Sequence, residues 1–156
     1  AIGGGFNRDK KSVEGRNFEG VLGEYAMALY LEVPIDRVIR PEGDKGVDLE
    51  VPVQVEDLIQ VLAMGVRYTR FPRGRLYQDR KYPKADVLGL AVEGYGDKVD
   101  APFGPKICLG VRLAGWVWND VFMKECRPDH KHNHPGWYVM QNRLRKMEDL
   151  WERRVR

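Results

Sequence analysis

The residues with the clearest chemical potential lie in the stretch GDKGVDLEVPVQVEDLIQVLAMG, residues 43–65. Asp48 leads into one apolar segment, and a second apolar segment contains the run Gln60-Val61-Leu62. Side chains alternate across a β-strand, so Gln60 and Leu62 share one face. If the two segments pair as a hairpin, we expect Asp48 to lie near Gln60, where a carboxylate and an amide oxygen can share a metal ion.

A site made of oxygen ligands suits a hard divalent cation, Mg²⁺ or Mn²⁺, which keeps water molecules for substrate and nucleophile. A metal at this position polarises a phosphoryl oxygen and activates an attacking water. Glu24, on a segment predicted to be helical, is the acid that would complete the ligand shell. Without further support this trio is weak evidence, because isolated acids are more often solvated or capping residues. Asp44, directly after Gly43, more often shapes a turn than binds a metal.

Five stretches occur in a characteristic order: GVLGEYAMALYLEV, GDKGVDLEV, LIQVLAM, KADVLGLAV and VRLAGWVW. Over residues 15–150 the chain resembles the PD-(D/E)XK nuclease superfamily, which has a restriction-endonuclease-like core and small members common in phages. The resemblance implies a metal-dependent deoxyribonuclease. It also implies site residues: Glu24 as the helix acid, Asp48 as the motif acid, Gln60 at the first position of the (D/E)XK tripeptide, the backbone carbonyl of Val61 as a further metal ligand, and Leu62 at the catalytic lysine position.

Leu62 departs from this pattern, because leucine supplies neither charge nor hydrogen-bond donor to the transition state. Loss of such a group commonly lowers the rate by about 10²-fold or more. Three explanations stay open: a deliberate inactivating substitution, a cation moved to Arg67 or Lys81, or a natural binding module that has lost catalysis. On the resemblance, we expect Leu62→Lys to create or restore Mg²⁺-dependent cleavage.

A basic and aromatic segment, RYTRFPRGRLYQDRKYPK, follows at residues 67–84. Basic side chains neutralise phosphates and aromatic rings stack on bases, so we expect this segment to bind DNA with little sequence selectivity. The bland alternative is a solvated loop whose aromatic rings pack into the core. The predicted DNA-binding residues are Arg67, Tyr68, Arg70, Arg73, Arg75, Arg80, Lys81 and Lys84.

Two further groups of residues invite a functional interpretation. The stretch CRPDHKHNHPGW offers possible zinc ligands, but a polar loop is favoured because no matching second ligand pair exists except the distant Cys108. Trp116 and Trp118 alternate at strand spacing, and we expect them to be buried in the core. The possible zinc ligands are Cys126, His130, His132 and His134.

The elements that must position these residues follow from the hydrophobic pattern. It predicts a helix over about residues 12–31 and a late helix, capped by Asn142, that carries Leu144, Met147, Leu150 and Trp151. Residues 1–11 are predicted to form a Gly-rich basic arm, and residues 12–156 a single domain. The fold class is α/β, mixed α+β, with a central mixed sheet flanked by helices. Strands are predicted at residues 47–55, 58–64, 86–92 and 107–113.

The composition of the chain limits the classes of function to be considered. The chain has 156 residues, 43% apolar and 31% charged, with a net charge of +3 and two cysteines. We expect a cytoplasmic protein, in the host cell if viral, without a membrane segment or secretory signal. Phage DNA processing, replication or recombination by an impaired Mg²⁺-dependent nuclease is the first hypothesis, with DNA as partner and a homo-oligomer compatible with the sequence. A non-catalytic DNA-binding or recombination accessory protein is the alternative, and a packaging or structural protein is a third.

Overall fold

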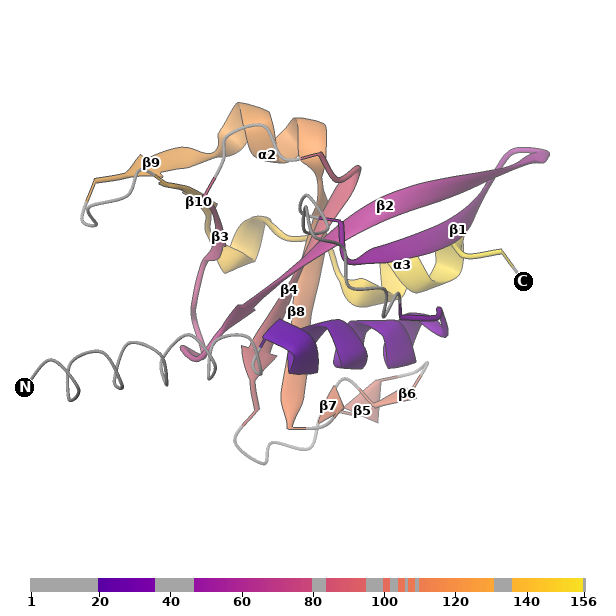
Figure 1. Ribbon diagram of the computed structural model, residues 1–156, viewed down its shortest axis with the longest axis horizontal. Helices are drawn as coiled ribbons and strands as arrows, with labels where there is room; N and C mark the ends of the chain where they lie inside the picture. The colour runs from indigo at the N-terminus through magenta and orange to yellow at the C-terminus, as the bar shows by residue number, and fades with distance from the viewer. Residues whose placement is uncertain are drawn as a thin grey trace, which may run out of the picture.

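A computed structural model describes residues 20–35, 47–79, 84–94, 100–101, 104–105, 107–108, 110–130 and 136–155 of the chain. The fold is mixed α+β, with a five-stranded central sheet, a three-stranded second sheet and a short two-stranded sheet. Figure 1 shows the arrangement. The central sheet has the order β1 (Leu49–Val55), β2 (Leu58–Thr69), β4 (Val87–Glu93), β8 (Val111–Trp118) and β7 (Ile107–Cys108). The short sheet pairs β5 (Asp100–Ala101) with β6 (Gly104–Pro105).

The long strand β2 has a different neighbour along each half. Its first half pairs antiparallel with β1, from Val55 opposite Leu58 to Leu49 opposite Met64. Its second half pairs parallel with β4, from Met64 to Thr69. Because the two partners overlap only at Met64, the β1–β2 hairpin projects beyond the rest of the sheet (Figure 1).

The N-terminal helix, described over residues 20–31, packs on one face of the central sheet. A Cβ added to Gly23 would lie 3.2 Å from Ala91 and 3.5 Å from the Tyr68 ring, so the small residue permits the close approach of helix and sheet. The buried residues of this layer include Met27, Leu31, Val51, Leu62 and Trp116.

A second layer covers the opposite face. It consists of β3 (Leu76–Gln78), β10 (Gly136–Val139) and β9 (Arg127–Asp129), with α2 (Asn119–Glu125) beside them. Its core joins residues of this layer to residues of the central sheet that point away from the N-terminal helix. That core contains Leu76, Phe122 and Val139 together with Leu88, Leu90, Val92 and Val117.

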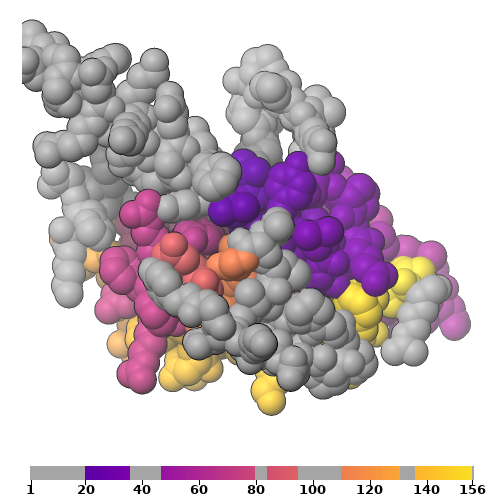
Figure 2. Space-filling model, turned by 90° about the horizontal axis from the view of Figure 1, so that it is seen from below, coloured from indigo at the N-terminus to yellow at the C-terminus, as the bar shows by residue number. Residues whose placement is uncertain are grey.

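The C-terminal residues Arg154 and Val155 run along the β1 edge of the hairpin, after two short helices. These two helices are the 3₁₀ helix η1 (Gln141–Arg143) and α3 (Met147–Arg153). Arg154 Nη1 donates to the carbonyl oxygen of Leu31 at 2.7 Å, which ties the chain end to the N-terminal helix. Figure 2 shows the yellow C-terminal residues beside the indigo helix. No described helix has the length and apolar content to cross a membrane.

The predicted central mixed sheet with helices is confirmed, whereas several boundaries differ. β2 continues to Thr69, and the predicted fourth strand is two strands that meet at Gly110, which has φ +75°. Asn142 lies in η1, and α3 begins only at Met147, so its predicted capping role is wrong. Burial of Trp116 is confirmed, while Trp118 is half-buried against the same core. The predicted arm, residues 1–11, lies outside the described residues.

Candidate nucleic-acid interface

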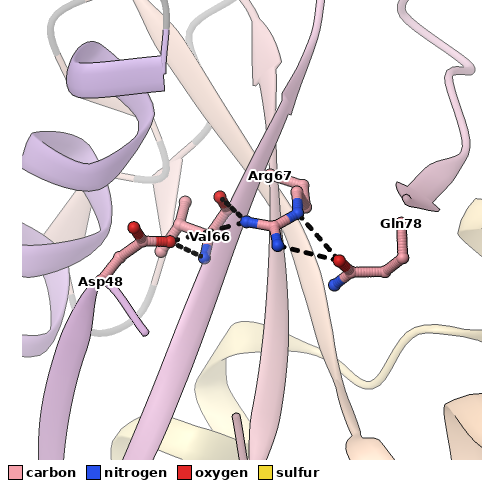
Figure 3. Close-up of polar contacts among 4 residues, drawn as sticks. All are labelled: Asp48, Val66, Arg67 and Gln78. Atoms are coloured by element: carbon pink, nitrogen blue, oxygen red, sulfur yellow. Dashed lines mark hydrogen bonds and ion pairs between the residues drawn. The ribbon is translucent and has the colours of Figure 1, made fainter. Parts of the chain in front are cut away.

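Asp48 sits immediately before β1 and is fixed against β2. Its backbone N–H donates to Met64 O at 2.8 Å, and its Oδ2 accepts the Val66 N–H at 2.7 Å. The same oxygen lies 3.6 Å from Arg67 Nη1, and the Asp48 side chain is only 5% exposed. Figure 3 shows this carboxylate turned toward β2. Asp48 therefore has a fixed position, with a guanidinium as its charged neighbour.

The strand register separates Asp48 from Gln60. Because the hairpin turns at Glu56 and Asp57, Gln60 lies opposite Val53, whereas Asp48 contacts β2 at Met64 and Val66. Four residues along a strand, from Met64 to Gln60, span about 13 Å. The expectation that Asp48 and Gln60 lie side by side is therefore wrong.

Leu62 and Val61, also implied by the nuclease resemblance, lie on the hairpin beyond the point where Asp48 contacts β2. Leu62 lies opposite Val51 in the core and is 1% exposed, while Val61 is exposed on the projecting hairpin. Glu24 lies on the N-terminal helix. Within the described part of the chain, no three His, Cys, Asp or Glu residues lie together as a metal-ligand set. The described residues thus do not form a ligand set for Mg²⁺ or Mn²⁺ around Asp48 and Gln60.

Arg67 points between the two sheets rather than out toward a ligand. Its Nε and Nη2 donate to Gln78 Oε1 at 3.1 and 2.8 Å, and its Nη1 donates to the Val66 carbonyl at 3.1 Å (Figure 3). Tyr68 packs against the core near Gly23. Two of the predicted DNA-binding residues therefore have structural contacts in the interior.

The turn after β2 is held in one conformation by side-chain hydrogen bonds. Gly74 N–H donates to Phe71 O at 2.8 Å, and a Cβ on Gly74 would clash with the Thr69 side chain. Gln141 Nε2 donates to Gly74 O at 2.9 Å, while Arg112 Nη2 donates to Pro72 O at 2.8 Å. These bonds join residues 71–74 to η1 and β8, so the exposed Arg73 and Arg75 emerge from an anchored turn.

Beside this turn lies a hollow of about 310 Å³, which we call the basic hollow. Tyr138 lies opposite Arg127 on β9, and the guanidinium of Arg75 lies 4.2 Å from the centre of the Tyr138 ring. Arg143 lines the hollow from η1, and among the described residues Glu125 is the one acid in its lining. The residues that line it are Glu125, Arg127, Tyr138, Val139, Met140, Asn142 and Arg143.

Sequence reasoning found Arg75 but missed Arg127, Tyr138 and Arg143. These residues lie more than 40 positions further along the chain, and only the pairing of β10 with β3 and β9 brings them to Arg75. The stretch from Arg127 to Arg143 has no basic run comparable to residues 67–84. The available signal was the alternation of Tyr138 with buried Val139 on a short strand.

The remaining predicted site residues fall elsewhere. Arg70 is exposed, and Lys84 lines a separate hollow with Asp86 and Asp120. Arg80 and Lys81 lie outside the described residues, as do His132 and His134. Of the predicted zinc ligands, His130 is exposed and Cys126 Sγ donates to Met123 O at 3.8 Å.

Comparisons with family models, with curated proteins and with solved structures give no match to this chain.

Proposed function

We propose that this protein binds DNA through the basic hollow and the anchored turn beside it. The observation that carries the proposal is that Arg75 lies over the Tyr138 ring, while Arg127 and Arg143 line the basic hollow together with Tyr138. Among the described residues, Arg127 and Arg143 line the hollow with one acid, Glu125, and Arg75 adds a third guanidinium beside Tyr138. Basic groups thus outnumber acids in this cluster, although the whole chain carries only +3.

Each component of this cluster has a role in holding a nucleic acid. Arginine side chains that contact phosphates release counterions, which gives affinity without sequence selectivity. The flat Arg75–Tyr138 stack offers a surface on which an unpaired base can lie. The Arg75–Tyr138 contact and the turn are held by interactions within the chain, so little ordering is required on binding.

The proposal is tested by fluorescence anisotropy of labelled duplex, single-stranded and branched DNA at several salt concentrations. We expect Arg75→Ala, Arg127→Ala and Arg143→Ala each to weaken binding. Each should also lower the slope of log K against log salt by about 0.9 for every phosphate that the variant no longer neutralises. Lys84→Ala removes the same charge from a different hollow and serves as the matched control. Equal weakening by Lys84→Ala would contradict the proposed position of the interface.

Metal-dependent hydrolysis of DNA is the second candidate, and one observation favours it. Arg67, which one of the three open explanations for Leu62 named as the position of the missing cation, lies 3.6 Å from Asp48. The arrangement thus places a carboxylate just before β1 beside a cation on β2 of a mixed sheet, as a restriction-endonuclease-like core would. Because the Arg67 guanidinium competes with any metal for the Asp48 carboxylate, we rank DNA binding above DNA cleavage as the function of this protein.

Cleavage is tested with the unmodified chain, supercoiled and linear DNA, and Mg²⁺ or Mn²⁺. Hydrolysis that disappears in Asp48→Asn would establish the second candidate. If the unmodified chain and Asp48→Asn both bind DNA and neither hydrolyses it, the protein is a non-catalytic DNA-binding protein.

A further inference from the structure

The first half of β2 has an edge that no described residue covers. Pairing with β4 begins at Met64, and just before it the Ala63 N–H donates to Asp86 Oδ2 at 2.8 Å and the Ala63 carbonyl accepts the Asp86 N–H at 2.7 Å. On the other side of the hairpin, Val155 N–H donates to Pro52 O at 3.2 Å and Val53 bridges to Arg154. Within the described part of the chain, residues 58–62 thus form an unpaired edge on their β4 side.

The direction of the backbone groups on this edge follows from the hydrogen bonds of Ala63. Successive residues of a strand direct their N–H and C=O groups to opposite sides, so Val61 and Ile59 point to the same side as Ala63. Pro52, which lies opposite Val61, directs its carbonyl to Val155 and has no N–H, as expected for a pair without mutual hydrogen bonds. The edge therefore presents two donors and two acceptors, from Ile59 and Val61.

The side chains of this edge are apolar and exposed. Ile59 is 63% exposed and Val61 53%, with Leu58 and Val55 exposed at the hairpin tip. A projecting apolar edge with unused hydrogen-bonding groups is a template for pairing with another strand. In Figure 1 the hairpin extends away from the second sheet, so the edge is distant from the basic hollow.

We propose that a second copy of this chain pairs with this edge, strand β2 against strand β2, antiparallel about a two-fold axis at Gln60. Ile59 of each copy then lies opposite Val61 of the other, and both pairs exchange two hydrogen bonds. The two Gln60 residues face each other without backbone hydrogen bonds. This interface goes beyond the proposed DNA binding and does not depend on it.

Three features favour a second copy over another occupant. The donor and acceptor pattern of residues 58–62 is self-complementary, because Ile59 and Val61 are symmetric about Gln60. The length of the free edge is set by the chain itself, from the turn at Glu56 and Asp57 to Ala63, which bonds Asp86 just before β4. A hollow of about 590 Å³, lined by Gln60 and Leu62, leaves room beside the edge for the incoming hairpin.

The charged residues near this edge also favour a second copy of the chain. With Gln60 on the axis, the tip residues Glu56 and Asp57 of one copy lie beside the segment that enters β4 in the other. That segment includes Lys84, which lines the same hollow as Gln60. The Asp86 carboxylate nearby accepts the Ala63 N–H. In this arrangement we expect Lys84 of one copy to offset the charge of Glu56 and Asp57 of the other, beside Asp86 and Asp120, which line the same hollow.

The interface is small, because five residues pair from each copy. Interfaces below about 1,200 Å² are generally weak or transient, so we expect a dissociation constant on the order of 100 µM. Sedimentation equilibrium of the full chain from about 1 µM to about 1 mM covers this range. We expect a monomer at the low end and a dimer at the high end.

Val61→Lys is the first variant, with Val21→Lys as the matched control. Val21 is 44% exposed on the N-terminal helix, so the control introduces the same charge at a similarly exposed valine. We expect Val61→Lys to remain monomeric at every concentration and Val21→Lys to dimerise like the unmodified chain. Circular dichroism spectra that match the unmodified chain confirm that both variants fold. A chain that stays monomeric throughout, or a dimer that Val61→Lys leaves unchanged, would overturn the proposal.

A disulfide test keeps the proposal falsifiable if Val61→Lys does not fold. Facing residues in a pair without hydrogen bonds bring their Cβ atoms to about 4.5–5.5 Å, close to disulfide geometry. Gln60→Cys, in a chain with Cys108→Ser and Cys126→Ser, should give a disulfide dimer on mild oxidation. Gln54→Cys, exposed on β1, is the control and should remain largely monomeric. Equal crosslinking of both variants would refute the two-fold axis at Gln60.

Discussion

Arg67 was expected from the sequence to contact DNA, but its contacts in the structure are internal. We predict that Arg67→Met lowers the free energy of unfolding and leaves DNA affinity almost unchanged. Methionine has similar length and no charge, so it removes the two hydrogen bonds to Gln78 Oε1 and the cation 3.6 Å from Asp48. The expected effect is therefore on stability rather than on binding.

The magnitude follows from the burial of the two partners. Gln78 is 2% exposed, and leaving its buried oxygen without these donors costs about 1–3 kcal/mol. The ion pair with Asp48 adds up to about 1 kcal/mol, because the Arg67 side chain is 30% exposed and partly screened by solvent. The total is about 1–4 kcal/mol. For a chain of this length, each kcal/mol lowers the Tm by about 2–4 °C.

Urea unfolding followed by circular dichroism gives the stability, and anisotropy with labelled duplex gives the DNA affinity. Arg73→Met makes the same change at an exposed position and should alter stability by no more than about 0.5 kcal/mol. In the Arg67→Met background, Gln78→Met should recover part of the stability, because it removes the buried oxygen as well. Unchanged stability together with a large decrease in DNA affinity would refute the assignment of Arg67 to the interior.

Three further predictions concern other parts of the fold. Leu62→Lys should destabilise the chain by several kcal/mol, because it places an ammonium group in the core, and nuclease assays should detect no new cleavage; a stable, active variant would favour the nuclease interpretation instead. Gly115→Ala should cost more than about 2 kcal/mol in thermal unfolding, because Gly115 has φ +152° and an added Cβ would lie 2.5 Å from Arg145 O; a Tm equal to that of the unmodified chain would contradict this close approach of Arg145 to Gly115. Burial and the charge of Glu148 raise the pKa of Tyr30 to about 12, against the opposing effect of Arg154. A raised pKa in the folded state means that the neutral hydroxyl contributes fully below the unfolded pKa of about 10 and that this contribution is lost as the pH rises toward 12. Urea titrations from pH 9 to 12 should therefore show a smaller decrease in stability for Tyr30→Phe than for the unmodified chain, and parallel decreases would contradict this.

Much of the fold could be predicted because local signals and tertiary structure agree. The turn at Glu56 and Asp57 between two apolar segments indicated the β1–β2 hairpin, which the structure confirms. The end of β2 at Thr69 could not be predicted, because its second half is stabilised by parallel pairing with β4, which is distant in sequence. The start of α3 was predicted wrongly because asparagine is a residue type that often caps helices. Asn142 instead lies in η1, and the chain then forms a β-bridge between Arg145 and Trp116 before α3 begins.

The candidate site was harder to predict, because its residues meet only through pairing between strands. Spacing placed Asp48 near Gln60, but the register is set by the turn and displaces the two residues along β2. Similarly, the composition of residues 67–84 indicated phosphate contact without showing which arginines point inward. Arg67 and Arg75 are the same residue type in the same basic segment. Yet Arg67 donates hydrogen bonds to Gln78, whereas Arg75 lies over the Tyr138 ring.

The central claim is that the cluster of Arg75, Arg127 and Arg143 around Tyr138 holds DNA. The most direct measurement is the affinity of the triple variant, with all three arginines changed to alanine, for labelled duplex and single-stranded DNA over a range of salt concentrations. We expect the unmodified chain to bind with a steep salt dependence. The triple variant should have little of that affinity and a salt slope smaller by at least about two units, on the basis of about 0.9 for each phosphate neutralised. A stable, folded triple variant that binds DNA as tightly as the unmodified chain would contradict the claim.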